Sequence, residues 1–389
     1  MFVQAYLKVS QDILASYKGE EPFSSFLKKF FAHHKKFGSR DRKNITGLCY
    51  GYFRLGKALL NLEPEDRLII GSFLCSHQTV IVDKLRPEWA AYSSQPLSRK
   101  IELVSNLYGF KAEDIFMFRD QVSEKIDLTT FSESFLIQPD AHLRIRPGRK
   151  RQVISKLAKA GVSYVELSDS SLALPAATKL QDFLLVDDEI VIQDFSSQRV
   201  IAPVKSYLSG SAKLATAWDC CAGSGGKSIL IKDSFPGVSL TVTDIRTSII
   251  QNLKNRFAKA GIQQFNAFVA DVGEDGFSLN QQFDLVLCDV PCTGSGTWGR
   301  TPEQLFFFKE DKIGYYSELQ KRILVNAVKS VARGGLLLYS TCSVFKEENE
   351  AIVAFIKEIS GFKLQVQQYF TGYELKGDSL FAALFVSEL

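Results

Sequence analysis

The sequence predicts an α/β fold for its C-terminal part, with a parallel sheet covered by helices on both faces. Three observations lead to it. Residues 1–130 carry apolar residues at helical spacings of three and four, and residues 131–205 mix short strands with one helix. From residue 206 onward, apolar runs that end in polar residues alternate with helical stretches. We therefore expect three domains: all-α over 1–130, small α+β over 131–205 and α/β over 206–389.

Composition limits the class of protein. A chain of 389 residues is too long for one ordinary core, and 46% hydrophobic with 23% charged residues is typical of a folded protein. The first residues show no secretory signal and no run approaches a spanning helix, so we expect a cytoplasmic protein without membrane contact, acting as a monomer. Its seven cysteines are then free thiols or ligands, and not a disulfide framework. No metal is expected, because there is no C-x-x-C pair and the four histidines lie far from the later cysteines.

The first two segments contain recognisable elements. FSSFLKKFFAHH and NITGLCYGYFRLGKALLNL have helical spacing. HLRIRP predicts a strand, RKRQVISKLAKAG a helix that ends at Gly161, and FLLVDDEIVIQD a further strand or hairpin.

The C-terminal segment predicts successive strands. They are LATAWD, SLTVTD, FNAFVAD, FDLVLCDVP and GGLLLYSTC, and LFAALFVSEL is expected as a last strand, antiparallel and at the edge. Ligands bind at the carboxyl ends of strands in such sheets. The residues expected at these ends are Asp219, Asp244, Asp271, Asp289 and Cys342.

A glycine-rich loop, DCCAGSGGKS, follows the first of these strands. A phosphate-binding P-loop would need glycine at Cys221, and a dinucleotide fingerprint would need it at Ser228. By itself the loop is equally compatible with an ordinary tight turn. Asp244, about 20 residues further on, is suited to accept both ribose hydroxyls of a nucleoside, and Asp271 to accept an adenine amino group. A nucleoside with a non-phosphate tail, S-adenosylmethionine, fits best. The loop residues expected to bind it are Cys221, Ala222, Gly223, Ser224, Gly225, Gly226 and Lys227.

Two later segments carry a family resemblance. CDVPCTGSGTWGRTPE and YSTCSVFKEENE resemble the paired signatures of RNA (cytosine-5) methyltransferases of the Sun/RsmB and NSUN group. KFGSRDRKNITGLCYGYFR is similar to the NusB-like N-terminal domain of the RsmB-type members, and HLRIRP with IVIQDFSSQ to their small, RRM-like bridging domain. The resemblance implies a class I (Rossmann-like) methyltransferase domain behind these two domains, with 16S ribosomal RNA or a small-subunit precursor as substrate.

The resemblance also implies roles for individual residues. Cys342 would be the nucleophile that adds to carbon 6 of cytosine, Cys292 would assist breakdown of the adduct, and Asp289 would contact the target base near the methionine part of the cofactor. The family loop usually reads C-A-A-P-G-G-K-T, and Gly223 and Ser224 replace its alanine and proline. We expect a looser loop but an active enzyme.

Charged residues give two further expectations. Glu347, Glu348 and Glu350 are assigned to the first turn of the last long helix, where they favour its dipole. Two basic runs, Lys28–Lys43 and Arg144–Lys159, are expected to contact RNA phosphates.

Three alternatives stay open. The RNA could be transfer RNA instead of ribosomal RNA. A DNA cytosine methyltransferase is disfavoured by Cys342 and by the helical N-terminal segment. A non-catalytic RNA-binding assembly factor would account for the altered cofactor loop.

Overall fold

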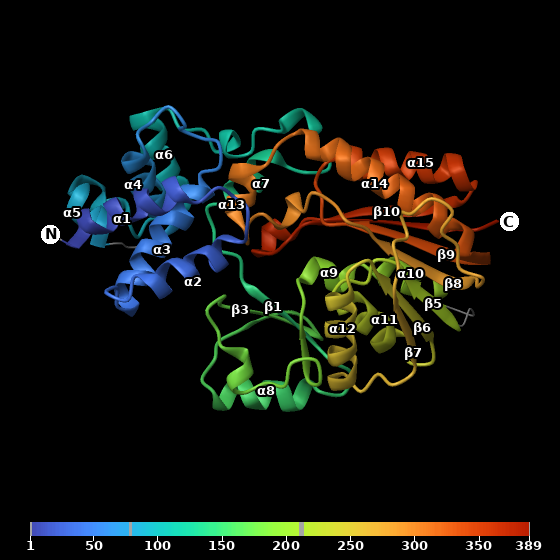
Figure 1. The fold of residues 1–389 in the computed structure, drawn as a ribbon. Helices are drawn as coiled ribbons and strands as arrows, with labels where there is room; N and C mark the ends of the chain where they lie inside the picture. The colour runs from blue at the N-terminus through green and yellow to red at the C-terminus, as the bar shows by residue number, and fades with distance from the viewer. Residues whose placement is uncertain (1, 78–79, 210–213, 389) are drawn as a thin grey trace. The chain divides into compact units, whose positions relative to one another are not determined.

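The computed structural model describes residues 2–77, 80–209 and 214–388 (Figure 1). Its internal contacts divide the chain into two units, each described here by itself. The helical unit comprises the chain up to Gln138 together with Thr297–Glu310, and the sheet unit comprises Pro139–Gly296 and the chain from Asp311 onward. The finer division into domains 1–130, 131–205 and 206–389 stays a prediction.

The helical unit is built around aromatic side chains. Its α-helices are α1 (Phe2–Ser16), α2 (Phe23–His33), α3 (Ser39–Arg54), α4 (Pro64–Cys75), α5 (Val80–Leu85), α6 (Leu97–Tyr108), α7 (Leu128–Ser134) and α13 (Pro302–Phe307). Tyr17 of the segment after α1 packs on Phe23 at 4.8 Å between ring centroids, and Phe23 packs on Phe53 at 4.9 Å. The helical spacing of the N-terminal sequence is therefore confirmed.

One part of this unit comes from far along the chain. The segment Thr297–Glu310 carries the fully buried Trp298, and its Phe307 ring lies 5.4 Å from that of Tyr17. Glu303 accepts a hydrogen bond from the backbone N–H of Phe23 at 3.2 Å. A fragment that began at residue 206 would keep this segment but lose the side chains that bury it.

A small antiparallel sheet opens the sheet unit, with strand order β2-β3-β1-β4. Its elements are β1 (Ala141–Ile145), α8 (Lys150–Lys159), β2 (Val165–Ser168), β3 (Ser171–Leu174) and β4 (Ile190–Ile192). The expected strand over FLLVDDEIVIQD is wrong in its first half, because Asp187 adopts a positive φ of 74° and turns the chain before β4. Helix α8 ends before Gly161, whose φ is 63°, as predicted.

The large sheet has seven strands in the order β10-β11-β9-β8-β5-β6-β7. They are β5 (Thr216–Asp219), β6 (Ser239–Asp244), β7 (Phe265–Val269), β8 (Phe283–Asp289), β9 (Val331–Thr341), β10 (Lys363–Phe370) and β11 (Leu380–Val386). The five strands from β9 to β7 are parallel, and β10 and β11 are antiparallel. The predicted α/β class is confirmed. β11 is antiparallel as expected, but it lies inside the sheet, because its seven apolar residues are all buried whereas β10 is largely exposed.

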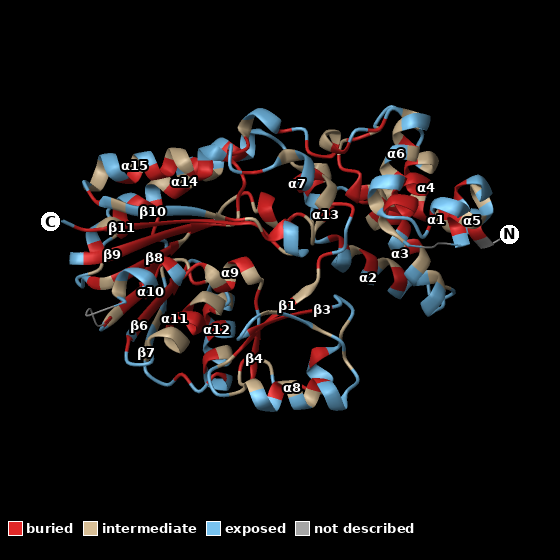
Figure 2. Cartoon of the chain, turned by 180° about the vertical axis from the view of Figure 1, so that it is seen from behind, coloured by how far each residue is buried: buried red, intermediate tan, exposed pale blue. Residues whose placement is uncertain are grey.

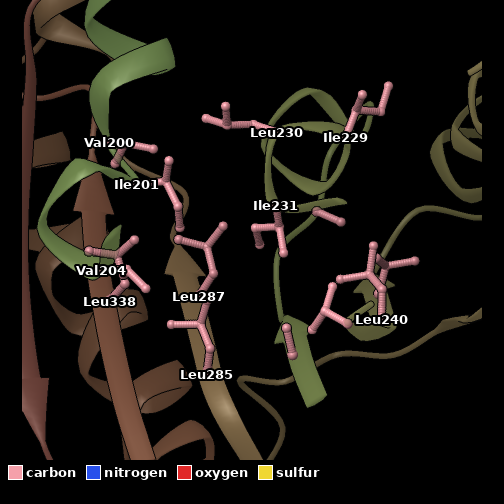
Figure 3. Packing of buried hydrophobic residues seen from close by; sticks show 14 of the residues in the cluster. Val200, Ile201, Val204, Ile229, Leu230, Ile231, Leu240, Leu285, Leu287 and Leu338 are labelled. Atoms are coloured by element: carbon pink, nitrogen blue, oxygen red, sulfur yellow. The ribbon is translucent and has the colours of Figure 1, made fainter. Parts of the chain in front are cut away.

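Helices cover both faces of this sheet (Figure 1). Helices α9 (Phe195–Arg199), α10 (Ala202–Leu208), α11 (Gly226–Ser234) and α12 (Thr247–Lys259) lie on one face, and α14 (Asp311–Ala327) and α15 (Glu350–Ser360) lie on the other. Leu285 and Leu287 of β8 pack with Ile231 on the first face (Figure 3), whereas Val286 packs with Leu324 on the second. Figure 2 shows the resulting red, buried interior of β8 and β11.

In the part of the chain that the structure describes, no helix is both long and apolar enough to cross a membrane. Within the same residues, no three His, Cys, Asp or Glu side chains form a group that would hold a metal ion.

Candidate active site

The glycine-rich loop joins β5 to α11 at the carboxyl edge of the sheet. Gly223 and Gly225 have φ angles of 53° and 84°, which side chains other than glycine rarely adopt. At Gly225 a Cβ would also lie 3.0 Å from Leu253 and Phe257 of α12. The loop therefore needs glycine at 225 for packing as well as for its backbone conformation.

Ser224, one of the two departures from the family loop, has a tether of its own. The Arg256 guanidinium donates hydrogen bonds to the Ser224 carbonyl at 2.8 Å and to its hydroxyl at 3.0 Å. Arg256 also forms an ion pair with Asp187 at 2.7 Å. This chain of contacts restrains the loop from α12 and from the turn before β4.

Asp244 lies at the end of β6, beside this loop. Its carboxylate accepts hydrogen bonds from the Gly223 N–H at 3.0 Å, and from the backbone and side chain of Arg246 at 3.0 and 2.9 Å. Burial alone would raise the pKa of Asp244, but these bonds outweigh it and hold the pKa below its usual value. Asp271 follows β7, is exposed, and accepts the Gly273 N–H at 2.9 Å.

Asp219 ends β5 and is almost fully buried, with 1% of its surface exposed. One carboxylate oxygen accepts the Ser228 hydroxyl at 2.6 Å, and the other has no hydrogen-bond partner. Burial raises the pKa of Asp219 to about 7, against the opposing effect of the Ser228 bond. A buried, unpaired acceptor at the start of the loop is suited to a ligand that brings its own N–H or O–H group.

This shift predicts a pH-dependent stability. The raised pKa means that folded Asp219 holds its proton up to about pH 7 while the unfolded chain loses it near pH 4, so its contribution to stability falls as the pH rises between these values. The amide of the Asp219→Asn variant cannot ionise, so the variant should not share this loss. We expect the unfolding free energy of Asp219→Asn, relative to that of the wild type, to be about 3 kcal/mol higher at pH 8 than at pH 5. Urea unfolding at both pH values measures it, and a difference independent of pH would contradict it.

The two cysteines singled out by the sequence lie together. Cys292 follows β8 and Cys342 follows β9, which are neighbours in the sheet, and their sulfur atoms are 3.3 Å apart. Both are half-buried. The Gly296 N–H donates to the Cys342 carbonyl at 2.9 Å, and a Cβ at 296 would lie 2.2 Å from the Ser379 carbonyl oxygen. Glycine at 296 thus lets the loop after Cys292 lie directly against Cys342.

Asp289 and Lys227 form an ion pair beside the thiols. The Lys227 ammonium lies 2.7 Å from one Asp289 oxygen, and the Ser340 hydroxyl donates to the other at 3.1 Å. Burial lowers the pKa of Lys227, but the Asp289 carboxylate and the charge of Cys342 raise it by more, so the net shift is upward. The structure thus brings Lys227 of the loop, Asp289 and both cysteines into one site.

Glu348 corrects the sequence prediction for the acidic run. Only Glu350 begins α15, whereas Lys346–Glu348 form a separate short 3-10 turn. Glu348 is fully buried, and its carboxylate accepts hydrogen bonds from Thr293 and Ser343, the residues that follow the two cysteines. Sequence reasoning missed this residue. The available signal was the pair of hydroxyl residues that directly follow Cys292 and Cys342.

The two basic runs differ. All seven Lys and Arg residues of Lys28–Lys43 are exposed, and its single acid, Asp41, accepts the Tyr6 hydroxyl at 2.6 Å. The second run is not a free basic surface, because acids from elsewhere in the sequence neutralise much of it. Arg144 and Arg146 pair with Asp233, Arg149 pairs with Asp188, and Lys156 pairs with Glu189.

Known proteins resemble this chain in sequence. Residues 211–379 match the family model of 16S rRNA methyltransferase RsmB/F. A curated relative from Bacillus subtilis, the probable ribosomal RNA small subunit methyltransferase B, is 28% identical over 235 residues, which are 59% of this chain and 52% of the relative. The ribosomal RNA small subunit methyltransferase B of Xanthomonas campestris is 30% identical over 184 residues, 46% of this chain and 40% of the relative. The chain spans about half the length of the curated relatives it matches.

Solved structures share the fold of much of the chain, including the segment that matches the family model. PH0851 matches with a TM-score of 0.69 at 21% identity over 94% of both chains. NSun6 from Pyrococcus horikoshii, solved with SFG, matches with a TM-score of 0.57 at 15% identity, over 74% of this chain and 97% of that one. These likenesses support the predicted α/β fold of the large sheet, and the N-terminal region is helical as predicted.

Proposed function

We propose that the protein is an S-adenosylmethionine-dependent RNA methyltransferase that forms 5-methylcytosine in 16S ribosomal RNA. The observation that carries the proposal is the pair of thiols, Cys292 and Cys342, 3.3 Å apart beside the Lys227–Asp289 ion pair. Carbon 5 of cytosine is a poor nucleophile, and a thiolate that adds to carbon 6 makes it reactive. A second thiol beside the first is suited to the reverse step.

Cys342 is proposed as the attacking residue. Its sulfur forms a bond to carbon 6, and the electrons of the C5–C6 double bond shift to the C4–C5 position. The product is an enamine whose carbon 5 is nucleophilic. The Lys227 ammonium interacts electrostatically with Cys342, so the site provides a positive charge near the attacking sulfur. Asp289, held by Lys227 and Ser340, is proposed to contact the target base.

Cys292 is proposed to assist release. The hydrogen bond with Cys342, together with burial and the negative charges of Cys342 and Glu348, raises the pKa of Cys292 well above its usual value. Cys292 is proposed to act after Cys342 is bonded to carbon 6 and the methyl group has been transferred to carbon 5. It then loses its proton to solvent and takes the remaining hydrogen of carbon 5 as a proton. The double bond then re-forms and Cys342 leaves as a thiolate.

The residues around the loop fit S-adenosylmethionine. Asp244 offers an ionised carboxylate for the ribose hydroxyls. Asp219 has a buried oxygen without a hydrogen-bond partner. The glycines of the loop, such as Gly225, let the backbone approach a ligand closely. Asp271 is proposed for the adenine amino group. When bound, this cofactor supplies the methyl group as an electrophile. The NSun6 relative was solved with SFG, and the same pocket is proposed here.

Replacement of Asp244 tests the cofactor site. Asp244→Ala removes a charged acceptor, and loss of such a hydrogen bond costs roughly 1.5–3 kcal/mol, which is about a 10- to 150-fold rise in Kd. Calorimetric titration with S-adenosylmethionine measures it. Asp275→Ala, which removes an exposed carboxylate outside the proposed site, is the control and should bind normally. An unchanged Kd for Asp244→Ala would count against the whole cofactor assignment.

RNA is proposed to reach the protein through the exposed basic run Lys28–Lys43. Its lysines and arginines are exposed and can contact phosphates, although Lys29 also pairs with Glu21 at 2.8 Å. The target cytosine must be unpaired or flipped out to reach half-buried thiols. A ribosomal substrate supports a cytoplasmic location.

The substrate can be tested directly. The purified protein is incubated with labelled S-adenosylmethionine and with small ribosomal subunits, naked 16S RNA, transfer RNA or DNA, and bisulfite sequencing then locates the modified base. The proposal expects 5-methylcytosine in 16S RNA. Labelling of transfer RNA alone would change the substrate, labelling of DNA alone would reject an RNA enzyme, and cofactor binding without any transfer would favour an assembly factor.

A further inference from the structure

Glu348 is a buried carboxylate whose partners account for all of its hydrogen-bonding capacity. It is fully buried in the sheet unit. One oxygen accepts the Thr293 N–H at 2.9 Å and the Gln320 side-chain amide at 3.1 Å, and the other accepts the Thr293 hydroxyl at 2.5 Å and the Ser343 hydroxyl. Because both oxygens are occupied by these donors, the carboxylate does not itself reach a reacting atom.

These donors belong to the two loops that carry the thiols. Thr293 directly follows Cys292, and Ser343 directly follows Cys342. The two loops come from different strands, 50 residues apart in sequence. Glu348 therefore bonds to both loops one residue away from each sulfur atom. It reinforces direct contacts between the loops, such as the Thr293 and Ser343 hydroxyls at 3.3 Å and the Gly296 N–H on the Cys342 carbonyl at 2.9 Å.

The residue next to Glu348 restrains the same loop from its other side. Asn349 accepts the Thr341 hydroxyl at 2.6 Å and donates to the Ser343 carbonyl at 2.9 Å. Thr341 and Ser343 flank Cys342, so the backbone on both sides of this cysteine is held. The Tyr339 hydroxyl donates to the Glu348 carbonyl at 2.5 Å, which fixes the short turn to β9.

Burying a carboxylate is costly unless it is well supplied with donors, and shape alone would not require one here. Burial raises the pKa of Glu348, and the hydrogen bonds from Ser343, Thr293 and Gln320 act against this. An acceptor with two oxygens can hold donors from two loops at once. An apolar residue of similar size would remove the acceptor that the Thr293, Ser343 and Gln320 donors share.

We infer that Glu348 is a positioning residue that locks the Cys292 loop to the Cys342 loop and thereby sets the distance between the attacking and the releasing thiol. The catalytic meaning of this distance rests on the proposed function, whereas the geometric role does not. The two parts can therefore be tested separately.

The geometric part is tested by disulfide trapping. Diamide oxidises two adjacent thiols to a disulfide and takes up their hydrogens, and its rate depends on how often the sulfur atoms meet. Glu348→Ala should slow formation of the Cys292–Cys342 disulfide about tenfold, as followed by peptide mass spectrometry. Glu348→Gln keeps an oxygen acceptor, and the Thr293 and Ser343 hydroxyls can turn to accept from its amide, so its rate should stay within about threefold of the wild type.

The catalytic part is tested by kinetics on the same variants. Glu348→Ala should lower kcat about 100-fold with the Kd for S-adenosylmethionine unchanged, and Glu348→Gln should restore most of the loss. Glu347→Gln is the matched control, since Glu347 is an exposed neighbour bonded to Ser317, and it should match the wild type in both assays.

The outcomes separate the two proposals. A folded Glu348→Ala variant that forms the disulfide at the wild-type rate would overturn the positioning role. Slowed trapping in a protein whose wild type methylates no nucleic acid would support the positioning role and reject the proposed function. If Glu348→Ala does not fold, Thr293→Val removes one donor while keeping its shape; it should slow trapping severalfold, Thr293→Ser should not, and equal rates for the two would overturn the inference.

Discussion

Cys342→Ala is expected to abolish methylation of cytosine while leaving cofactor binding intact. The substitution removes the sulfur that is proposed to add to carbon 6, and the hydroxyl of the preceding Thr341 is engaged by Asn349. We expect a loss of transfer of at least about 10⁴-fold, typical of removing a catalytic nucleophile. Labelled-methyl transfer to 16S RNA measures the rate, and calorimetry with S-adenosylmethionine measures binding.

Denaturing electrophoresis provides the second measurement. Cys342→Ala should form no RNA–protein species that survives denaturation, with or without cofactor. Cys75→Ala, which changes a free cysteine of the helical unit, is the control and should transfer methyl groups at the wild-type rate. If Cys342→Ala retains full transfer, covalent catalysis through this residue is wrong for the protein.

Cys292→Ala is expected to fail at a later step. Cys342 can still attack and carbon 5 can still be methylated, but the neighbouring thiol proposed to take the carbon 5 proton is gone. The adduct should therefore accumulate as a stable RNA–protein species, and turnover should fall by about 10²- to 10⁴-fold, the usual contribution of a general acid–base group. Electrophoresis after nuclease digestion measures the trapped fraction.

The double variant orders the two residues. If Cys342 acts first, Cys292→Ala combined with Cys342→Ala should lose the trapped species. The opposite pattern, with adduct in Cys342→Ala and none in Cys292→Ala, would exchange the roles of the two thiols.

Part of the candidate site could be predicted from the sequence because it depends on the order of residues along each strand. A strand that ends in a polar residue places that residue at the carboxyl edge, and parallel strands bring their carboxyl edges together. Asp219, Asp244, Asp271, Asp289 and Cys342 could therefore be assigned to one edge from the sequence alone. Glu348 could not, because its partners lie 5 and 55 residues away and an acidic run before a helix has an ordinary local explanation.

Strand order was also outside the reach of the sequence pattern. The apolar run of β11 predicts a buried strand, but whether it lies at the edge or between β9 and β10 depends on which strands pair with it. The segment Thr297–Glu310 behaves likewise. Its aromatic residues indicate a core, but only the fold assigns them to the helical unit.

The sequence by itself determined the α/β class, the strand ends and the chemistry of the residues at those ends, because hydrophobic periodicity and residue type are local properties. The tertiary structure decided which charges remain free and which groups support the thiols. Arg144 and Arg146 form a basic run in sequence, yet Asp233, almost 90 residues away, neutralises them. Pairing of this kind depends on distances in space, and a linear pattern carries no information on them.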